Sequence, residues 1–268
     1  MQFQTMTGGV GRWNGNMIGR LGGSLLDLLF PRHCVVCGGS QTGEHTQLCR
    51  ECAARIEQEG SAPVCPACGG AARPFEVSGG RCAACRQRPP RVLGTARAGP
   101  YRSLLGNLLL AYKYRGREEL RRVLAERLAS ATRCAPWIGR IEAVVPVPTH
   151  WRHRLTRSVY PAEVLSSAVA RATSLPLVPL LRRTRAGRHQ VGLAYTKRLE
   201  NVRGAFAFRK GYALSGARLL IVDDVRTTGA TIDECARVLR RAGADEVYAA
   251  VVVKADLAPT GTRPAVAI

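Results

Sequence analysis

Apolar and polar positions repeat with two different periods along residues 95–256, and each period predicts one kind of element. Apolar residues recur three and four positions apart in segments that we expect to be helices, namely 104–112, 120–128, 161–169 and 230–242. Uninterrupted apolar runs predict buried strands at 141–148, 175–181, 205–208, 217–225 and 246–253. Strands that alternate with helices indicate an α/β fold, in which a parallel sheet is covered by helices on both faces.

The first third of the chain has a different composition. Residues 25–90 contain eight cysteines and many glycines and prolines, but few large apolar side chains. Such a segment cannot bury a sufficient core of its own and needs another source of stability. We therefore expect a flexible extension at 1–24, a small cysteine-rich domain at 25–90, a main domain at 95–256 and a tail at 257–268.

The eight cysteines form four Cys-x-x-Cys pairs, and the gaps between pairs are 11, 12 and 13 residues. Each pair can direct two thiolates at one metal ion, and four thiolates complete a tetrahedral zinc site. The simplest arrangement joins neighbouring pairs in two structural zinc sites, whereas an iron–sulfur cluster is the alternative. The spacing alone leaves the pairing open. The expected ligands are Cys34, Cys37, Cys49, Cys52, Cys65, Cys68, Cys82 and Cys85. Of the isolated cysteines, we expect Cys235 to be a core residue.

The sequence predicts neither a membrane span nor a signal peptide. No stretch has the roughly 18 apolar residues that a spanning helix needs. The best apolar run near the N-terminus, Leu25–Phe30, is interrupted by Asp27. We therefore expect a cytoplasmic protein, in which reducing conditions leave the cysteines available for metal.

The chain of 268 residues carries a net charge of +21, which suggests an anionic partner such as nucleic acid, a phosphate-bearing ligand or an acidic protein. Residues 101–210 concentrate the excess, with 22 basic and six acidic side chains. Only four of the 40 basic residues are lysines, and such an arginine bias can also reflect genomic base composition. Tyrosines interleave with Lys113, Arg115 and Arg117, a pattern that fits a grip on single-stranded DNA or a solvated helix end.

The strongest predicted strand ends in two adjacent acids, Asp223 and Asp224, and a short loop leads from them into a helix. Ligands of open parallel sheets bind at the carboxyl ends of the strands. The amides and the dipole of a helix N-terminus favour a phosphate there, and a glycine allows close approach of the backbone. A ribose 5-phosphate fits both parts: the carboxylates accept from the 2′ and 3′ hydroxyls, and the phosphate lies on Thr227, Thr228, Gly229, Ala230 and Thr231.

Two other interpretations of this motif are weaker. The acids could belong to the magnesium-binding strand of a P-loop ATPase, but the chain has no G-x-x-x-x-G-K-[ST] segment. They could simply end the strand while Thr227 caps the helix, but two adjacent like charges at a buried edge are costly without a partner. Arg226 stands between the acids and the loop, where it could pair with Asp224 or reach a phosphate.

The stretch LLIVDDVRTTGAT resembles the phosphoribosyl-pyrophosphate signature of type I phosphoribosyltransferases. From about Leu25 to Lys254 the chain resembles the ComF (also GntX) family of competence-associated, phosphoribosyltransferase-like proteins. The similar segments are LLDLLFPRHCVVCGG, the four cysteine pairs, LLLAYKYRG (108–116), VVPVPTH (144–150), RHQVGLAYTKRLENVRGAF (188–206) and the acidic motif. The resemblance implies a double zinc ribbon followed by a type I phosphoribosyltransferase domain.

The resemblance also implies roles for individual residues. Asp223 and Asp224 match the acids that bind the ribose hydroxyls, and 227–231 matches the loop that binds the 5-phosphate. The segment after VPVP is similar to the pyrophosphate-side loop and keeps Arg157. The RHQVGL segment is similar to the mobile hood of the family, with Arg188 and Gln190 as contacts. Magnesium would accompany phosphoribosyl pyrophosphate (PRPP) and have few direct protein ligands.

One segment departs from the family pattern. The family usually has an Arg-Gly-Phe-Asn-Gln-like segment after VPVP, whereas this chain has RSVYP at 157–161 and so lacks the glycine and both amide side chains. Three functions stay open. The first is a phosphoribosyltransferase that acts in DNA uptake. The second is a non-catalytic module that senses PRPP or binds single-stranded DNA and docks a competence-machinery protein through its ribbons. The third is a nucleotide-salvage enzyme, for which the sequence shows no nucleobase pocket.

Overall fold

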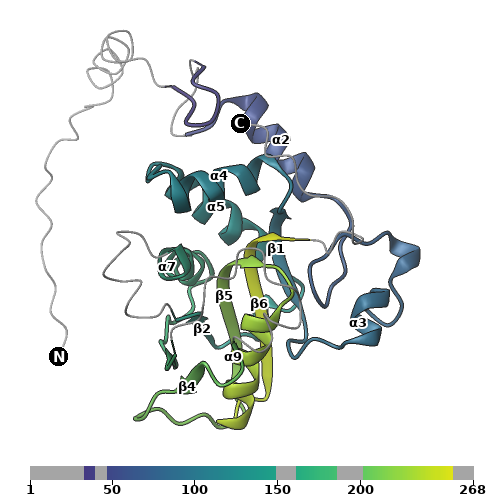
Figure 1. The fold of residues 1–268 in the computed structure, drawn as a ribbon, viewed down its shortest axis with the longest axis vertical. Helices are drawn as coiled ribbons and strands as arrows, with labels where there is room; N and C mark the ends of the chain where they lie inside the picture. Colours follow the sequence, from purple (N-terminus) through teal and green to yellow (C-terminus); the bar gives the residue numbers. More distant parts are fainter. Residues whose placement is uncertain (1–32, 40–46, 149–160, 186–201, 256–268) are drawn as a thin grey trace, which may run out of the picture. The chain divides into compact units, whose positions relative to one another are not determined.

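The computed structural model describes residues 33–39, 47–148, 161–185 and 202–255 (Figure 1). The chain divides into two units, residues 1–50 and 51–268, which are described separately. The first contributes two short described segments, 33–39 and 47–50. The expectations for the extension 1–24, for residues 157–160 of RSVYP and for the tail lie outside the described residues.

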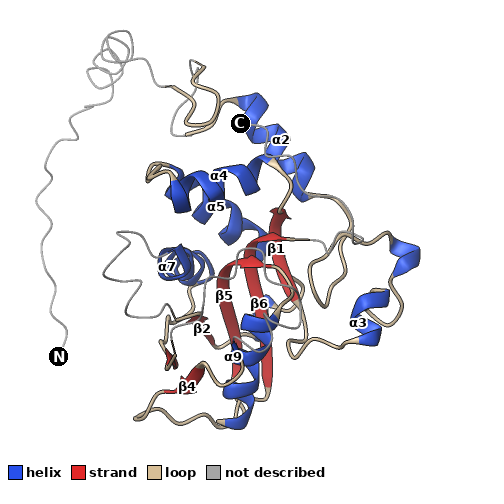
Figure 2. Cartoon of the chain, viewed as in Figure 1, coloured by secondary structure: helices blue, strands red, loops and turns tan. Residues whose placement is uncertain are grey.

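A sheet of four parallel strands forms the centre of the second unit (Figure 2). Its order is β1–β6–β5–β2, and the register places Val222 of β5 between Pro146 of β2 and Ala250 of β6. The strands are β1 (Thr95–Pro100), β2 (Ala143–Pro146), β5 (Arg218–Arg226) and β6 (Glu246–Lys254). A separate antiparallel pair consists of β3 (Leu181–Arg183) and β4 (Phe206–Phe208).

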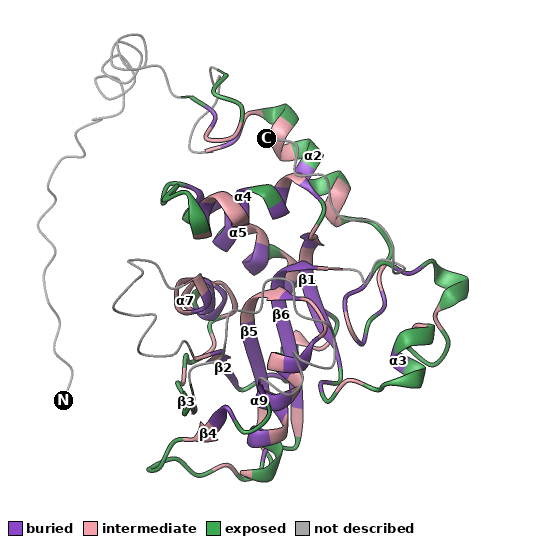
Figure 3. Cartoon of the chain, viewed as in Figure 1, coloured by how far each residue is buried: buried purple, intermediate pink, exposed green. Residues whose placement is uncertain are grey.

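Helices cover both faces of the parallel sheet. α9 (Ala230–Arg241) contacts β5 and β6 on one face, where Leu219 and Ile221 belong to its core. The alternate residues Leu220 and Val222 are also completely buried, because α7 contacts β5 on the opposite face and α5 contacts β6 (Figure 3). Among the described residues, the other helices are α2 (Arg50–Gly60), α3 (Ala83–Gln87), α4 (Leu104–Tyr114), α5 (Leu120–Arg133) and α7 (Pro161–Thr173), and short 3-10 turns are η1 (Pro74–Glu76) and η2 (Ile138–Arg140).

The sequence pattern predicted most of these elements but not all. α4, α5, α7 and α9 begin where the helical periodicity begins, and Gly243 has φ +105° beyond the end of α9. The expected strand at 175–181 is only partly a strand: residues around Leu177 form a single bridge beside β2, and the pairing with β4 begins at Leu181. The elements that were not predicted include α2, α3, the two 3-10 turns and the edge strand β1. No helix among the described residues is long and apolar enough to cross a membrane.

Candidate functional site

The two acids of the motif lie within β5, which continues to Arg226, and not after its end. Asp223 pairs with Val251 of β6 in the register of the sheet. Neighbouring strand residues direct their side chains to opposite faces. Asp223 is accordingly on the face of Ile221 and α9, whereas Asp224 is directed toward α4. Although the two side chains point to opposite faces, the backbone N–H of Asp224 donates to Oδ1 of Asp223 over 2.8 Å.

Asp224 forms an ion pair with Lys113, near the end of α4. The Nζ atom of Lys113 lies 2.7 Å from Oδ2 of Asp224, and each side chain is 15% exposed. Burial alone lowers the pKa of an ammonium, but the carboxylate of Asp224 outweighs this effect and the pKa of Lys113 is raised. For Lys113 this contact agrees with neither interpretation of the basic helix end, because the lysine is paired with Asp224 and is neither a solvated cation nor available to DNA.

Asp223 is in an environment that opposes its ionisation. Burial, followed by the negative charge of Asp224, raises the pKa of Asp223 to about 7. The positive charges of Lys113 and Arg183 act in the opposite direction. Arg183 belongs to β3, and its guanidinium lies 5.4 Å from the ring centroid of Phe206 on β4. Two cations from separate elements therefore flank the two acids.

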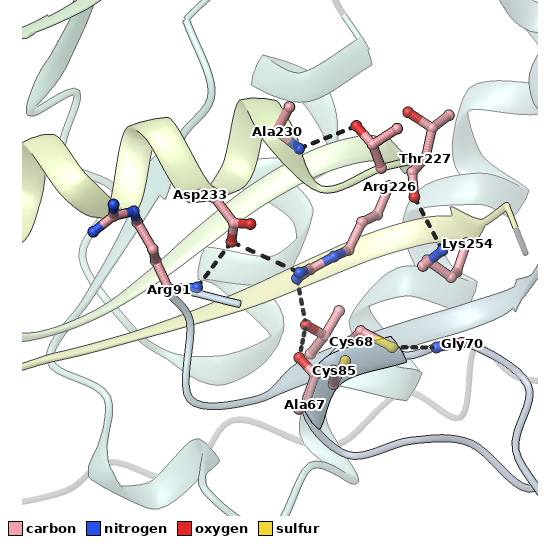
Figure 4. Close-up of polar contacts among 12 residues, drawn as sticks. Ala67, Cys68, Gly70, Cys85, Arg91, Arg226, Thr227, Ala230, Asp233 and Lys254 are labelled. Carbon is pink, nitrogen blue, oxygen red and sulfur yellow. Dashed lines mark hydrogen bonds and ion pairs between the residues drawn. The ribbon is translucent and has the colours of Figure 1, made fainter. Parts of the chain in front are cut away.

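The loop Thr227–Thr231, which we call the TTGAT loop, connects β5 to the N-terminus of α9. Gly229 adopts φ +86°, a left-handed conformation that favours glycine, and occupies the N-cap position. The hydroxyl of Thr228 accepts from the backbone N–H of Ala230 over 3.3 Å. On the other side, the ammonium of Lys254 donates to the carbonyl of Thr227 over 3.0 Å (Figure 4). A helix N-terminus and a buried cation thus meet at the loop, an arrangement that suits a phosphate.

Arg226 does not make either of the contacts expected from the sequence. Its side chain is directed toward Asp233 and is only 3% exposed (Figure 4). Nη1 donates to the hydroxyl of Thr95 over 2.8 Å, and Nη2 lies 3.8 Å from Oδ1 of Asp233. The expected pairing with Asp224 was wrong because Lys113 takes that position. A group buried to this extent is also not presented to a phosphate on the outer side of the loop.

A cavity of about 490 Å³ lies at the carboxyl end of β2, beside the antiparallel pair β3–β4. It combines apolar walls with a basic margin, and its lining includes Val147, Leu177, Leu181, Arg182, Arg183 and Arg209. Arg183 connects it to the acids, since this guanidinium also interacts with the charge of Asp223. No sequence pattern predicted a pocket here, because its lining comes from four segments that are separated along the chain.

The eight paired cysteines gather in two groups. The sulfur atoms of each group all lie within 4.8 Å of one another, and the groups are Cys34, Cys37, Cys49 and Cys52, and Cys65, Cys68, Cys82 and Cys85. Neighbouring pairs are therefore combined in sequential order. Cys235 is completely buried in the core behind α9, as expected.

The second group fits a structural zinc ion. Its ribbon has a core of only four buried residues, two of which are the ligands Cys65 and Cys85. Backbone N–H groups donate to the sulfurs, from Gly70 to Cys68 over 3.3 Å and from Cys82 to Cys65 over 3.2 Å. Burial and then the charge of neighbouring thiolates raise the pKa of Cys85. Four adjacent thiolates cannot ionise together without a cation, and a zinc ion supplies that charge.

Three residues expected at the site, Arg157, Arg188 and Gln190, lie outside the described residues. The structure therefore brings the acids and the TTGAT loop together at the end of β5, and it gathers the paired cysteines in two separate clusters. It adds Lys113, Arg183 and Lys254, which sequence reasoning did not assign to the site.

Comparison with known proteins identifies both parts of the chain. Residues 25–86 match the double zinc ribbon domain family, and residues 155–265 match the phosphoribosyl transferase domain family. These matches confirm the predicted fold class, a phosphoribosyltransferase-type α/β domain preceded by a cysteine-rich ribbon domain.

Relatives extend over most of the chain. Competence protein F of Haemophilus influenzae is 28% identical over 81% of this chain and 95% of that protein. The DNA utilization protein YhgH of Salmonella typhimurium is 29% identical over 82% of this chain and 96% of that protein. A shorter similarity, 49% identity over 57 residues, covers 21% of this chain and 31% of an adenine phosphoribosyltransferase of Mycobacteroides abscessus. The resemblance to the ComF family is thereby confirmed.

Proposed function

We propose that this chain, a relative of competence protein F that joins a double zinc ribbon to a phosphoribosyl transferase domain, binds PRPP with magnesium and acts in the use or uptake of DNA. The observation that carries the proposal is the position of the two acids beside the TTGAT loop, at the carboxyl end of β5. Carboxylates accept hydrogen bonds from hydroxyls, and a helix N-terminus favours a phosphate. A ribose 5-phosphate presents both groups.

In this proposal Asp223 and Asp224 accept from the 2′ and 3′ hydroxyls of the ribose, and the TTGAT loop binds the 5-phosphate. Lys113 forms an ion pair with Asp224 and so holds this side chain in place. Arg183 favours the ionised form of Asp223 and extends positive charge toward the cavity at the end of β2. Magnesium would be brought mainly by the pyrophosphate of the ligand, because the site offers few carboxylates that are not already paired.

The reaction of the fold, if this chain performs it, is displacement of pyrophosphate at C1 of the ribose. The transition state resembles a ribosyl cation, so the protein would position the reactants and stabilise the charge that develops on the leaving pyrophosphate. The basic margin of the cavity, formed by Arg182, Arg183 and Arg209, lies where such charge could be neutralised. Its apolar walls would then receive the acceptor.

Calorimetric titration with PRPP and magnesium tests the binding step. The zinc-loaded wild-type chain is compared with the Asp223→Ala, Asp224→Ala double variant. We expect the wild type to bind and the double variant to lose binding by about a hundredfold, because two hydrogen-bonded charged groups are removed. A folded wild-type protein that binds no PRPP would contradict the proposal and leave the motif as a scaffold.

A non-catalytic module that binds single-stranded DNA is the second candidate. The net charge of +21, the names of the relatives and the RSVYP departure favour it. The ion pair between Lys113 and Asp224 argues against α4 as the DNA-binding helix, because this lysine already has a partner. Release of pyrophosphate with an acceptor supports an enzyme, whereas salt-dependent DNA binding without turnover supports the module. Turnover that requires a free nucleobase would identify a salvage enzyme.

A further inference from the structure

The second zinc ribbon is attached to the sheet through the turn between its first two cysteines. Pro66 and Ala67 lie between Cys65 and Cys68, and both of their carbonyls bind the first residue of β1. The backbone N–H of Thr95 donates to Pro66 over 2.9 Å, and the hydroxyl of Thr95 donates to Ala67 over 2.8 Å. The turn that would bind the metal is therefore fixed to one threonine of the phosphoribosyltransferase-type domain.

The same threonine hydroxyl has a second bond, to the segment that carries the acidic motif. It accepts from Nη1 of Arg226 over 2.8 Å, and Thr95 and Arg226 are 5% and 3% exposed. A hydroxyl can donate one bond and accept others, so Thr95 satisfies the ribbon and the arginine at once. Figure 4 shows this line of contacts from Ala67 to Arg226. One side chain thus joins two segments that are distant in the sequence.

Arg226 in turn lies directly beneath the TTGAT loop. A β-carbon on Gly229 would come within 3.0 Å of its Nη2 atom, and Asp233 in the first turn of α9 lies 3.8 Å from the same nitrogen. Asp233 also accepts from the backbone N–H of Arg91, over 3.0 Å. A buried guanidinium is costly unless its partners stay in place. A shift of Thr95 would therefore be transmitted to the position of Gly229 and the start of α9.

We propose that Arg226 is a positioning residue that couples metal binding at Cys65, Cys68, Cys82 and Cys85 to ligand binding at the TTGAT loop, through the hydroxyl of Thr95. The ligand part of this inference rests on the proposed function, whereas the structural part does not. Zinc fixes the 65–70 turn, the turn fixes Thr95, and Thr95 fixes the arginine on which the loop rests. Because coupling between two binding sites is reciprocal, ligand at the loop would also slow the loss of zinc from this cluster.

Hydrogen exchange of the full, zinc-loaded chain measures the structural part without any ligand. Thr95→Val keeps the shape of the side chain and deletes the hydroxyl, whereas Thr95→Ser restores a hydroxyl. Thr132→Val is the matched control, because Thr132 is completely buried and donates to Leu128 over 2.8 Å away from this line of contacts. Native mass spectrometry establishes that each variant carries its zinc. The measured quantity is amide exchange in residues 227–235.

Thr95→Val loses both hydrogen bonds of the hydroxyl, and the bond to Arg226 is the one that bears on this segment, so we expect exchange to speed up about fivefold, and Thr95→Ser to stay near the wild type. Unchanged exchange in Thr95→Val, or an equal increase in Thr132→Val, would overturn the coupling. Zinc release to a colorimetric chelator then measures the reciprocal effect: PRPP with magnesium should slow it in the wild type and not in Thr95→Val. A wild type that binds no PRPP refutes the proposed function, while the exchange experiment still decides the coupling.

Discussion

The ammonium of Lys113 lies 2.7 Å from a carboxylate oxygen of Asp224, and this contact joins the end of α4 to the acidic motif of β5. The two residues are far apart along the chain, and no sequence pattern predicts that they pair. The pair matters because Asp223 and Asp224 are adjacent acids, and the positive charge of Lys113 favours the ionised form of Asp223. The first prediction follows from this contact.

Replacing Lys113 with methionine should weaken PRPP binding at pH 7 by about fivefold, because a rise of about one unit in the pKa of Asp223, from about 7, lowers its ionised fraction from about a half to about a tenth. Loss of the cation raises the pKa of Asp223 further, so less of the carboxylate is available to accept from a ribose hydroxyl. The deficit should shrink toward about pH 9, where Asp223 ionises in either protein. Calorimetry at several pH values measures this, with Arg115→Met, an exposed cation on the same helix end, as control. Tighter binding by Lys113→Met at pH 7 would mean that the lysine competes with the ligand for Asp224.

Asp223 should also make the stability of the ligand-free protein depend on pH. Burial raises its pKa from 3.8 to about 7 in the folded state. Between these values the folded protein binds a proton that the unfolded chain does not, so the free energy of unfolding falls as pH rises from about 4 to about 7. Above about 7 this contribution is lost and the curve is flat.

Urea unfolding between about pH 5.5 and pH 8 measures this dependence. Asp223→Asn removes the titrating group while it preserves the shape of the side chain, so the variant should have a shallower slope below pH 7. Parallel curves for the two proteins would show that Asp223 ionises normally in the fold.

Gly229→Ala should destabilise the protein and weaken phosphate binding together. The residue has φ +86°, and a β-carbon would lie 3.0 Å from the buried guanidinium of Arg226. Gly211 is a matched control, because it has φ +89° but no atom within 4 Å of an added β-carbon. We expect about 1 kcal/mol for Gly211→Ala from the backbone alone, and about 1 kcal/mol more for Gly229→Ala from the contact. Equal losses in thermal unfolding would show that the arginine moves aside without cost.

The number of zinc ions bound per chain should equal the number of intact cysteine clusters. Native mass spectrometry of the wild type is expected to show two zinc ions per chain, and Cys82→Ser should retain one. Cys134→Ser changes an exposed cysteine outside both clusters and should retain two. Because the second ribbon has so small a core, Cys82→Ser should also expose residues 61–88 to proteolysis. Bound iron with visible absorption would instead show that the cysteines hold an iron–sulfur cluster and not zinc.

Much of the fold and of the motif chemistry is determined by short segments of the sequence. The helical periodicity of α4, α5 and α9, the apolar runs of β5 and β6 and the Cys-x-x-Cys pairs are each contained in short segments, so the sequence predicted them. β1 was missed for the opposite reason. Its sequence, TARAGP, has no apolar run and includes the buried Arg97, and it becomes a strand only because β6 pairs with it.

What the sequence determined by itself, therefore, was the inventory of the site: two acids, a glycine-containing loop before a helix, and eight thiols in four pairs. Which charges neutralise those acids was decided only by the tertiary structure. Arg226 is two residues from Asp224 along the chain, yet Lys113 pairs with Asp224, and Arg226 is buried against Thr95 and Asp233. Packing against distant segments, α4 for Asp224 and β1 and α9 for Arg226, selects the partner of each charge, and sequence proximity does not.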